Sequence, residues 1–374
     1  MYFAAANAAL KYKKEAAPLK MWYLTGLMKL ADLDYTFPEE LIATSPQRPS
    51  RVMWVGHGRP QEISLQDLMA RIPAGDVLVV NNTRVLKRRV FAGDVEILFL
   101  KQLQALEWEV LFPSKKYKVG AVLELPLGLS MTLLEKGRPQ KVRLSQEVQE
   151  DYFQKVAELP LPPYIQKARD QRHTVEADES WYQTAWAKSP GSFAAPTASL
   201  HFSAQDMETL KAQGVVIGEV TLHVGLGTFL PVTAEDLNDH DMHEEYVEIP
   251  AATWEVVNNT RKKGGKVWSL GTTTTRSLES AAQGLLQGNS SEGFRGFTKL
   301  LIQSGYQFKV VDRLLTNFHQ PQSTLLALVA GFSSLETVKA CYHWAIERKF
   351  RLFSYGDLSC WTRDDKPEPL PIED

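Results

Sequence analysis

The sequence has only two cysteines, Cys341 and Cys360, among 374 residues. Two cysteines cannot form the disulfide framework of a small secreted domain, so the fold must depend on its own hydrophobic core. No apolar run approaches the length that a helix needs to cross a bilayer. These absences exclude a disulfide scaffold and a membrane span, and they favour a protein of the reducing cytoplasm.

An excess of charge of either sign is also missing. Lysine and arginine together number 42, against 44 aspartates and glutamates, and the formal net charge is −2. Bulk charge of this kind does not indicate binding to nucleic acid or to a membrane surface. Any polyanion would therefore be held by a local basic patch.

Residues 1–27 show little hydrophobic periodicity and hold four lysines and one glutamate. A signal peptide places its positive charge before an apolar core, whereas Lys11, Lys13 and Lys14 follow the mostly apolar segment 4–10. This order argues against secretion. We interpret residues 1–27 as an N-terminal extension and residues 365–374 as a C-terminal tail.

The remaining chain predicts an α/β protein with two domains, because it is 44% hydrophobic, 23% charged and longer than one typical domain. The apolar run 77–80 reads as a buried strand that ends at the polar turn 81–84. Short alternating runs separated by glycine, proline and lysine turns then predict a small antiparallel barrel or sandwich over residues 89–156. We expect residues 28–88 and 157–364 to form the main domain.

Beyond Leu159 the pattern changes to helices alternating with apolar strands. Several helix starts resemble capping boxes, in which a hydroxyl and a carboxylate three residues later satisfy each other's backbone N–H groups. The pairs are Ser203 with Asp206, Thr233 with Asp236 and Ser333 with Glu336. They predict three helices.

Residues 266–285 read as a strand, a hydroxyl-rich turn from Gly271 to Arg276, and a helix. Such a turn presents N–H groups and hydroxyls at the positive end of a helix, which suits a carboxylate or a phosphate. A turn whose hydroxyls only cap the helix explains the same residues without a ligand. Both interpretations stand on the sequence.

Histidines gather at strand ends and turns in the second half of the chain. His223 ends an apolar strand just before Gly225 and Gly227, and His240 and His243 lie within the acidic segment 239–245. His319 lies in a proline-flanked loop. Imidazoles beside carboxylates suit proton transfer, which makes a catalytic role for at least one of them the favoured interpretation.

Two further patterns have competing explanations. Segment 114–118 places three lysines around Tyr117 at a predicted hairpin tip, which suits phosphate contact with base stacking or is simply a solvated turn. His240 and His243 lie three residues apart and could bind zinc, although no familiar two-histidine motif is present. The Gly225–Gly227 pair lacks the third glycine of a dinucleotide fingerprint.

Taken in order, seven blocks of sequence resemble the S-adenosylmethionine:tRNA ribosyltransferase-isomerase family of the queuosine pathway. They are residues 81–85 (NNTRV), 194–202 (AAPTASLHF), 221–229 (TLHVGLGTF), 240–245 (HDMHEE), 271–273 (GTT), 316–319 (TNFH) and 353–357 (FSYGD). The likeness runs from Met28 to about Cys360. Segment 88–94 is shorter than in the family, and Ser199 and Leu226 replace smaller residues.

The resemblance implies an α/β main domain with a central mixed, barrel-like sheet and a small β-barrel domain inserted after residues 81–85. It implies transfer and isomerisation of the ribosyl group of S-adenosylmethionine onto a 7-aminomethyl-7-deazaguanine at the tRNA wobble position. The products are epoxyqueuosine-tRNA, adenine and methionine. S-adenosylmethionine is then a cosubstrate, and neither a permanently bound cofactor nor a metal is expected.

On this basis we assign expected roles to residues of this chain. The proton-transfer residues are His223, His243, His319, Glu245 and Asp357. The residues expected to hold S-adenosylmethionine are Gly225, Gly227, Thr228, Gly271, Thr272, Thr273 and Arg276. The residues expected to engage the anticodon stem-loop of tRNA are Asn82, Arg84, Lys115, Lys116 and Lys118.

The competing functions are a non-catalytic RNA-binding protein and a metal-dependent hydrolase that uses His240 and His243. Release of adenine separates the enzyme from the first, and bound zinc would mark the second. We expect a cytoplasmic monomer without membrane contact. The sequence does not identify which histidine is the base.

Overall fold

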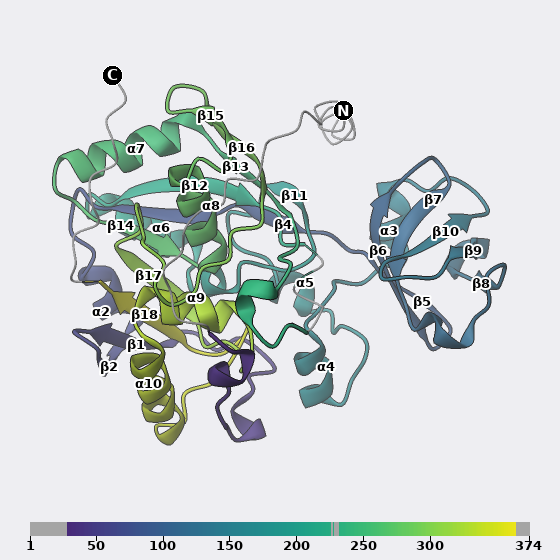
Figure 1. Ribbon diagram of the computed structural model, residues 1–374, viewed down its shortest axis with the longest axis horizontal. Helices are drawn as coiled ribbons and strands as arrows, with labels where there is room; N and C mark the ends of the chain where they lie inside the picture. Colours follow the sequence, from purple (N-terminus) through teal and green to yellow (C-terminus); the bar gives the residue numbers. More distant parts are fainter. Residues whose placement is uncertain (1–27, 226, 228–231, 364–374) are drawn as a thin grey trace.

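The computed structural model in Figure 1 describes residues 28–225, 227 and 232–363. A large body is built on a long sheet with helices on both faces, and a smaller sheet is set to one side of it. The expected N-terminal extension, the C-terminal tail and Thr228 lie outside the described residues.

A ten-stranded mixed sheet forms the centre of the large body. Its strand order is β15-β16-β13-β12-β3-β14-β17-β18-β1-β2. The central strands β12, β3, β14 and β17 run parallel, while β13, β16 and β15 continue the sheet in antiparallel fashion. The bounds are β1 Arg51–Gly56, β2 Arg59–Ser64, β3 Val77–Asn81, β12 Val216–Leu222, β13 Glu245–Ile249, β14 Val267–Leu270, β15 Gln287–Asn289, β16 Gly293–Thr298, β17 Arg313–Asn317 and β18 Leu358–Thr362.

Because the central strands are parallel, both of their faces must be covered, and two core clusters do this. One face packs against α7 and α8 through Trp254 and Leu278, and the same cluster continues into α9 and α10. The other face packs against α2 and α6 through Leu68 and Met207. The bounds are α2 Leu65–Ala70, α6 Ala204–Ala212, α7 Ala251–Lys262, α8 Thr272–Ala282, α9 Thr324–Phe332 and α10 Leu335–Glu347.

The smaller sheet has six antiparallel strands in the order β5-β6-β7-β10-β9-β8. Its end strands do not pair, so it approaches a barrel without closing, as Figure 1 shows on the right. The sheet and α3 enclose a core of their own around Phe99, Trp108 and Phe153. The bounds are β5 Arg89–Ala92, β6 Val95–Gln102, β7 Glu107–Leu111, β8 Val122–Glu124, β9 Ser130–Glu135, β10 Gln140–Leu144 and α3 Glu150–Val156. That residues 89–156 form an independent domain stays a prediction.

Two further short strands and three further short helices lie outside the two large sheets. Strand β4 pairs in parallel with β11 beside the carboxyl end of β3. The segment after the smaller sheet carries α4 and α5, and a 3₁₀ helix, η6, precedes α6. The bounds are β4 Thr83–Val85, β11 Ser189–Ser192, α4 Pro163–Arg169, α5 Asp178–Trp181 and η6 Thr197–His201.

Three local predictions need correction. Thr233 starts no helix, because Asp236 caps a 3₁₀ turn, η8 (Leu237–Asp239), instead. Ser334 rather than Ser333 caps α10, whereas the capping box at Ser203 is confirmed. The lysines of segment 114–118 are not at a hairpin tip. Strand β7 pairs with β6 and β10 rather than with β8, so this segment is a crossover that holds a 3₁₀ helix, η4 (Ser114–Lys116).

Candidate functional site

A single buried amide, that of Asn81, ties together the ends of three elements. Its Oδ1 accepts hydrogen bonds from the backbone N–H groups of Thr83 (3.1 Å) and Leu222 (3.0 Å). Its Nδ2 donates to the carbonyl of Leu222 (3.0 Å) and to Oγ1 of Thr273 (3.2 Å). Both ends of the amide are thus used, and β3, β12 and the start of α8 are fixed relative to one another.

His223 lies at the end of β12 within this arrangement. Oγ1 of Thr83 lies 2.8 Å from its Nδ1, and its ring stacks on Tyr246 with centroids 5.8 Å apart. Burial lowers the pKa of His223 to about 4, so the imidazole is neutral at pH 7. Among the described residues, Nε2 of His223 has no hydrogen-bond partner.

Gly191 on β11 makes room for this ring. A Cβ at Gly191 would lie 2.7 Å from Cδ2 and Nε2 of His223, closer than real side chains approach. The position therefore admits only glycine while the imidazole keeps its place. Thr83 on β4 and Gly191 on β11 thus form the two sides of the histidine site. Sequence analysis missed Gly191, because its contact with His223 spans 32 residues and carries no local pattern.

Glu245 and Arg276 form a buried ion pair beside the same strand end. Glu245 Oε1 accepts from the backbone N–H of Gly225 at 3.0 Å, and Oε2 pairs with Nη1 of Arg276. The two side chains are 9% and 8% exposed. Arg276 Nε donates to the carbonyl of Leu300 at 3.1 Å, but Nη2 is buried and has no hydrogen-bond partner in the described part of the chain. Glu245 therefore orients Arg276 and the Gly225 backbone rather than a histidine.

The hydroxyl-rich turn has two functions. Gly271 has φ 99° and opens α8, and its N–H donates to the carbonyl of Leu315. Oγ1 of Thr274 donates to the carbonyl of Leu270 and that of Thr275 bonds Oγ of Ser269, so these two hydroxyls tie the start of α8 to the end of β14, and no side chain caps the helix. The first-turn N–H groups of an α-helix have no partner within the helix. This leaves a positive helix end next to Thr273 and Asn81.

His243 lies against Gly227, which follows Gly225 two residues later; we call residues 225–227 the glycine segment. A Cβ at Gly227 would lie 2.9 Å from Cδ2 of His243, so the two residues are in close contact. His243 and His240 are both half-buried. In the described part of the chain, no three histidine, cysteine or acidic side chains gather closely enough to hold a metal ion.

His319 and Asp357 lie at other points of the fold. Nε2 of His319 bonds Oγ1 of Thr316 at 2.8 Å, and burial lowers the pKa of His319 to about 3. Asp357 accepts from the backbone N–H groups of Arg51 (3.1 Å) and Arg351 (2.8 Å). Burial raises the pKa of Asp357. Within the described residues neither side chain bonds His223, His243 or Glu245, and the gathering of all five around one substrate stays a prediction.

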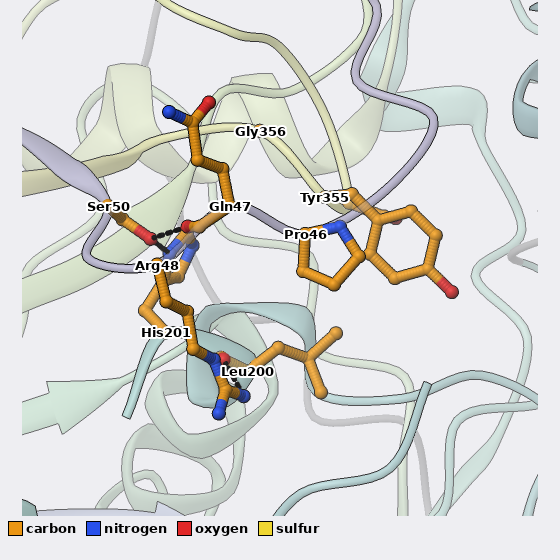
Figure 2. Close-up of a pocket in the computed structure, with 9 residues that line it drawn as sticks. Pro46, Gln47, Arg48, Ser50, Leu200, His201, Tyr355 and Gly356 are labelled. Carbon is orange, nitrogen blue, oxygen red and sulfur yellow. Dashed lines mark hydrogen bonds between the residues drawn. The ribbon is translucent and has the colours of Figure 1, made fainter. Parts of the chain in front are cut away.

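A second histidine network lines a hollow at the end of β17 (Figure 2). His201 Nδ1 lies 2.6 Å from Ser50 Oγ, and its Nε2 accepts from Asn317 Nδ2 at 3.0 Å. Burial lowers the pKa of His201 to about 3, and nearby Arg48 and Arg351 act in the same direction. The hollow is lined by Pro46, Gln47, Arg48, Ser50, Leu200, His201, Ser354, Tyr355 and Gly356. Sequence analysis gave His201 no role, because its partners lie 116 and 151 residues away.

The residues expected to bind tRNA divide into two sets. Asn82 is buried, accepts from Thr221 Oγ1 at 2.7 Å and donates to Glu219 at 3.0 Å, so its side chain serves the fold. Arg84 is exposed, as are Lys115, Lys116 and Lys118 on the crossover of the smaller sheet. Nζ of Lys116 lies 5.5 Å from the ring of Tyr117. None of these three lysines forms an ion pair with another described residue.

Among the described residues, no single helix is long and apolar enough to span a bilayer. Helices α9 and α10 together have the length and hydropathy of a span, but the chain bends by 109° between them. Most side chains of α9 are buried in the main core.

The chain is similar in sequence to known proteins over most of its length. A family profile described as "Queuosine biosynthesis protein" matches residues 30–360. The S-adenosylmethionine:tRNA ribosyltransferase-isomerase of Staphylococcus haemolyticus is 38% identical over 347 residues, covering 88% of this chain and 98% of that protein. The enzyme of the same name from Parvibaculum lavamentivorans is 40% identical over 348 residues, with the same coverage.

A solved structure has a similar fold. The crystal structure of S-adenosylmethionine tRNA ribosyltransferase from Thermotoga maritima superposes with a TM-score of 0.51 and is 29% identical. The match covers 88% of this chain and 99% of that chain. The similarity therefore includes both sheets of the fold.

Proposed function

The chain belongs to the queuosine biosynthesis protein family, and on that premise we propose that it is an S-adenosylmethionine:tRNA ribosyltransferase-isomerase. The enzyme transfers the ribosyl group of S-adenosylmethionine to the 7-aminomethyl-7-deazaguanine at the tRNA wobble position. Isomerisation gives epoxyqueuosine-tRNA and releases adenine and methionine. Identity of 38–40% across 98% of the relatives' length supports this activity.

The single observation that carries the chemistry is the hydrogen bond between Thr83 and His223. Asn81 holds this pair next to the start of α8, because its amide bonds both the backbone of Thr83 and the hydroxyl of Thr273. The reaction removes a proton from the 5′-carbon beside the sulfonium and delivers a proton to the departing adenine. Positioned acids and bases accelerate such transfers by about 10² to 10⁴. We assign the base to His223, because its Nε2 has no hydrogen-bond partner among the described residues.

The electrostatics of His223 agree with this role. Since the pKa of His223 is lowered to about 4, the ring is in its proton-accepting form at pH 7. Oγ1 of Thr83 lies 3.5 Å from the carbonyl of Ser189 and, when it donates there, accepts from Nδ1–H. That tautomer carries the lone pair on Nε2. A low pKa also makes the protonated ring a strong acid, able to pass its proton to adenine.

S-adenosylmethionine is placed between the glycine segment and the start of α8. The first-turn N–H groups of Thr272 and Thr273, next to Gly271, suit its methionine carboxylate or a ribose hydroxyl. Arg276 offers a buried N–H without a partner, and Glu245 fixes its guanidinium. Gly225, Gly227 and Thr228 complete the proposed site, with His243 at its edge.

We place the anticodon stem-loop on Arg84 and on the lysines of the small-sheet crossover, Lys115, Lys116 and Lys118. All four are exposed and form no ion pair within the described ranges, which leaves them available for phosphates. Asn82 acts indirectly, because its amide holds the β12 strand that carries His223. We also propose a cytoplasmic monomer that keeps no cofactor permanently bound.

The proposal is tested by mixing the purified protein, S-adenosylmethionine and a stem-loop that carries the 7-deazaguanine precursor. We expect stoichiometric adenine and epoxyqueuosine. Binding without adenine release would favour the non-catalytic RNA-binding alternative. Bound zinc together with loss of activity on chelation would favour the hydrolase alternative.

A further inference from the structure

A row of three aromatic rings crosses adjacent strands and begins at His223. Tyr246 on β13 stacks on His223 with centroids 5.8 Å apart and an interplanar angle of 22°. Phe297 on β16 pairs in register with Tyr246, and their rings are 5.6 Å apart. We call these three residues the aromatic strip. It leads from the proposed catalytic ring to the edge of the large sheet, where β12, β13 and β16 lie side by side (Figure 1).

The strip is on the sheet face that α7 and α8 do not cover. Side chains alternate along a strand, so the neighbours of Tyr246 and Phe297 point the other way. Val247 is fully buried in the same cluster as Trp254 of α7 and Leu278 of α8. Phe297 is 52% exposed, although a phenyl ring gains free energy from burial. An exposed ring of this kind, continuous with a reaction site, indicates a binding surface.

The charges around the strip show what kind of contact it makes. Arg295 lies two residues before Phe297 in β16, so it shares the face of that ring, and Lys299 follows the end of the strand. Arg295 lies across from Glu248 in the β13–β16 register, and Nζ of Lys299 bonds Asp241 at 2.8 Å. Lys299 is thus paired with a carboxylate, whereas Arg295 is exposed and forms no ion pair among the described residues. Contact with an RNA at this face would therefore combine stacking on Phe297 with one available cation, Arg295.

We propose that the aromatic strip is a stacking platform for the unpaired anticodon nucleotides next to the wobble base. The inference rests on the proposed function, which places the reacting nucleotide at His223. Single-stranded RNA is recognised by stacking its splayed bases on aromatic side chains, often on the open face of a sheet. Tyr246 and Phe297 supply such rings on consecutive strands, beginning at the reaction site.

The test uses the full chain and stem-loops that carry 2-aminopurine at the nucleotide beside the wobble position. Stacking on Phe297 quenches the fluorescence of this base when the complex forms. Phe297→Ala should remove the additional quenching and raise the Kd for the stem-loop roughly fivefold to a hundredfold. Phe297→Trp should restore the quenching and the Kd for the stem-loop, because tryptophan again offers an aromatic ring for stacking. Leu285→Ala is the matched control, because Leu285 is 46% exposed and follows α8 on the opposite side.

Further readouts separate stacking from a general loss of structure. Phe297→Ala should leave kcat at saturating stem-loop and the KM for S-adenosylmethionine within about twofold of wild type, and it should leave the salt slope of binding unchanged. An unchanged Kd and unchanged quenching in the folded variant would overturn the proposal. So would a wild-type dimer that Phe297→Ala converts to a monomer with normal RNA affinity. Phe297-dependent binding without adenine release would retain the platform but contradict the proposed function.

Discussion

The hydroxyl of Thr83 lies 2.8 Å from Nδ1 of His223, although the two residues are 140 positions apart in the chain. Asn81 fixes the backbone of Thr83, and Gly191 opposes the ring from the neighbouring strand. The pair sets the orientation of the imidazole and the nitrogen that carries its proton. The enzymatic account depends on this relationship.

Thr83→Val keeps the shape of the side chain and removes the hydroxyl. One hydrogen bond of about 1–1.5 kcal/mol then no longer orients the ring. We expect kcat to fall about tenfold while the Kd for S-adenosylmethionine changes little, as steady-state adenine release and calorimetry would measure. Thr83→Ser, which keeps the hydroxyl, is the control. A loss in Thr83→Ser as large as that in Thr83→Val would show that the hydrogen bond does not account for the effect.

Removing the charge of Glu245 should reduce stability strongly. Glu245→Gln leaves the buried guanidinium of Arg276 without its counter-charge, and breaking such a pair costs about 3–5 kcal/mol. Urea unfolding of the single variants and of Glu245→Leu combined with Arg276→Met measures this. The double variant should recover much of the loss. A single variant as stable as wild type would show that the pair is not buried in solution.

The buried His201 and His319 and the half-buried His223 should make the fold sensitive to acid. Burial lowers the pKa of His223 to about 4 and those of His201 and His319 to about 3, below the 6.5 of the unfolded chain. Between these values the unfolded state binds more protons than the folded state, so stability falls as pH drops from about 6.5 toward 3. His201→Gln should lessen the slope by up to about 1.4 kcal/mol per pH unit. Urea titrations at several pH values measure the slope, and an unchanged slope would contradict the burial of His201.

The lysine crossover should determine how salt affects RNA binding. Each neutralised phosphate adds about 0.7 to the slope of log K against log salt on single strands. Lys115→Ala should reduce that slope by about this amount in fluorescence titrations with the anticodon stem-loop. Lys155→Ala is the control, since Lys155 is exposed on α3 of the same sheet unit and pairs with Asp151. Equal slopes for wild type and Lys115→Ala would remove the crossover from the RNA surface.

Local pattern was sufficient to predict the elements around the site. The apolar run 77–80 is β3, and the run 267–270 followed by a hydroxyl turn is β14 and α8, because burial on both faces of a strand and the glycine between strand and helix leave local signatures. Segment 114–118, which carries the three lysines, was predicted as a hairpin tip and is a crossover, because strand pairing leaves no local signature. Whether β7 pairs with β8 or with β10 depends on contacts about 30 residues away, which no turn sequence records.

The site itself was only partly predictable. Residue type singled out His223, Glu245 and Arg276 as candidates, and their roles stay predictions. Their partners were not predictable, because pairing depends on where distant strands end. The network of His201, Ser50 and Asn317 shows the same limit, since each member looks ordinary in its own segment.

The most direct test is single-turnover adenine release by His223→Ala at saturating S-adenosylmethionine and stem-loop, compared with His243→Ala and His319→Ala. Loss of a general base lowers the rate by about 10² to 10⁴. The account predicts a loss of that size for His223→Ala, with both substrates still bound, and smaller losses for the other two variants. Adenine release by His223→Ala at the wild-type rate would contradict it.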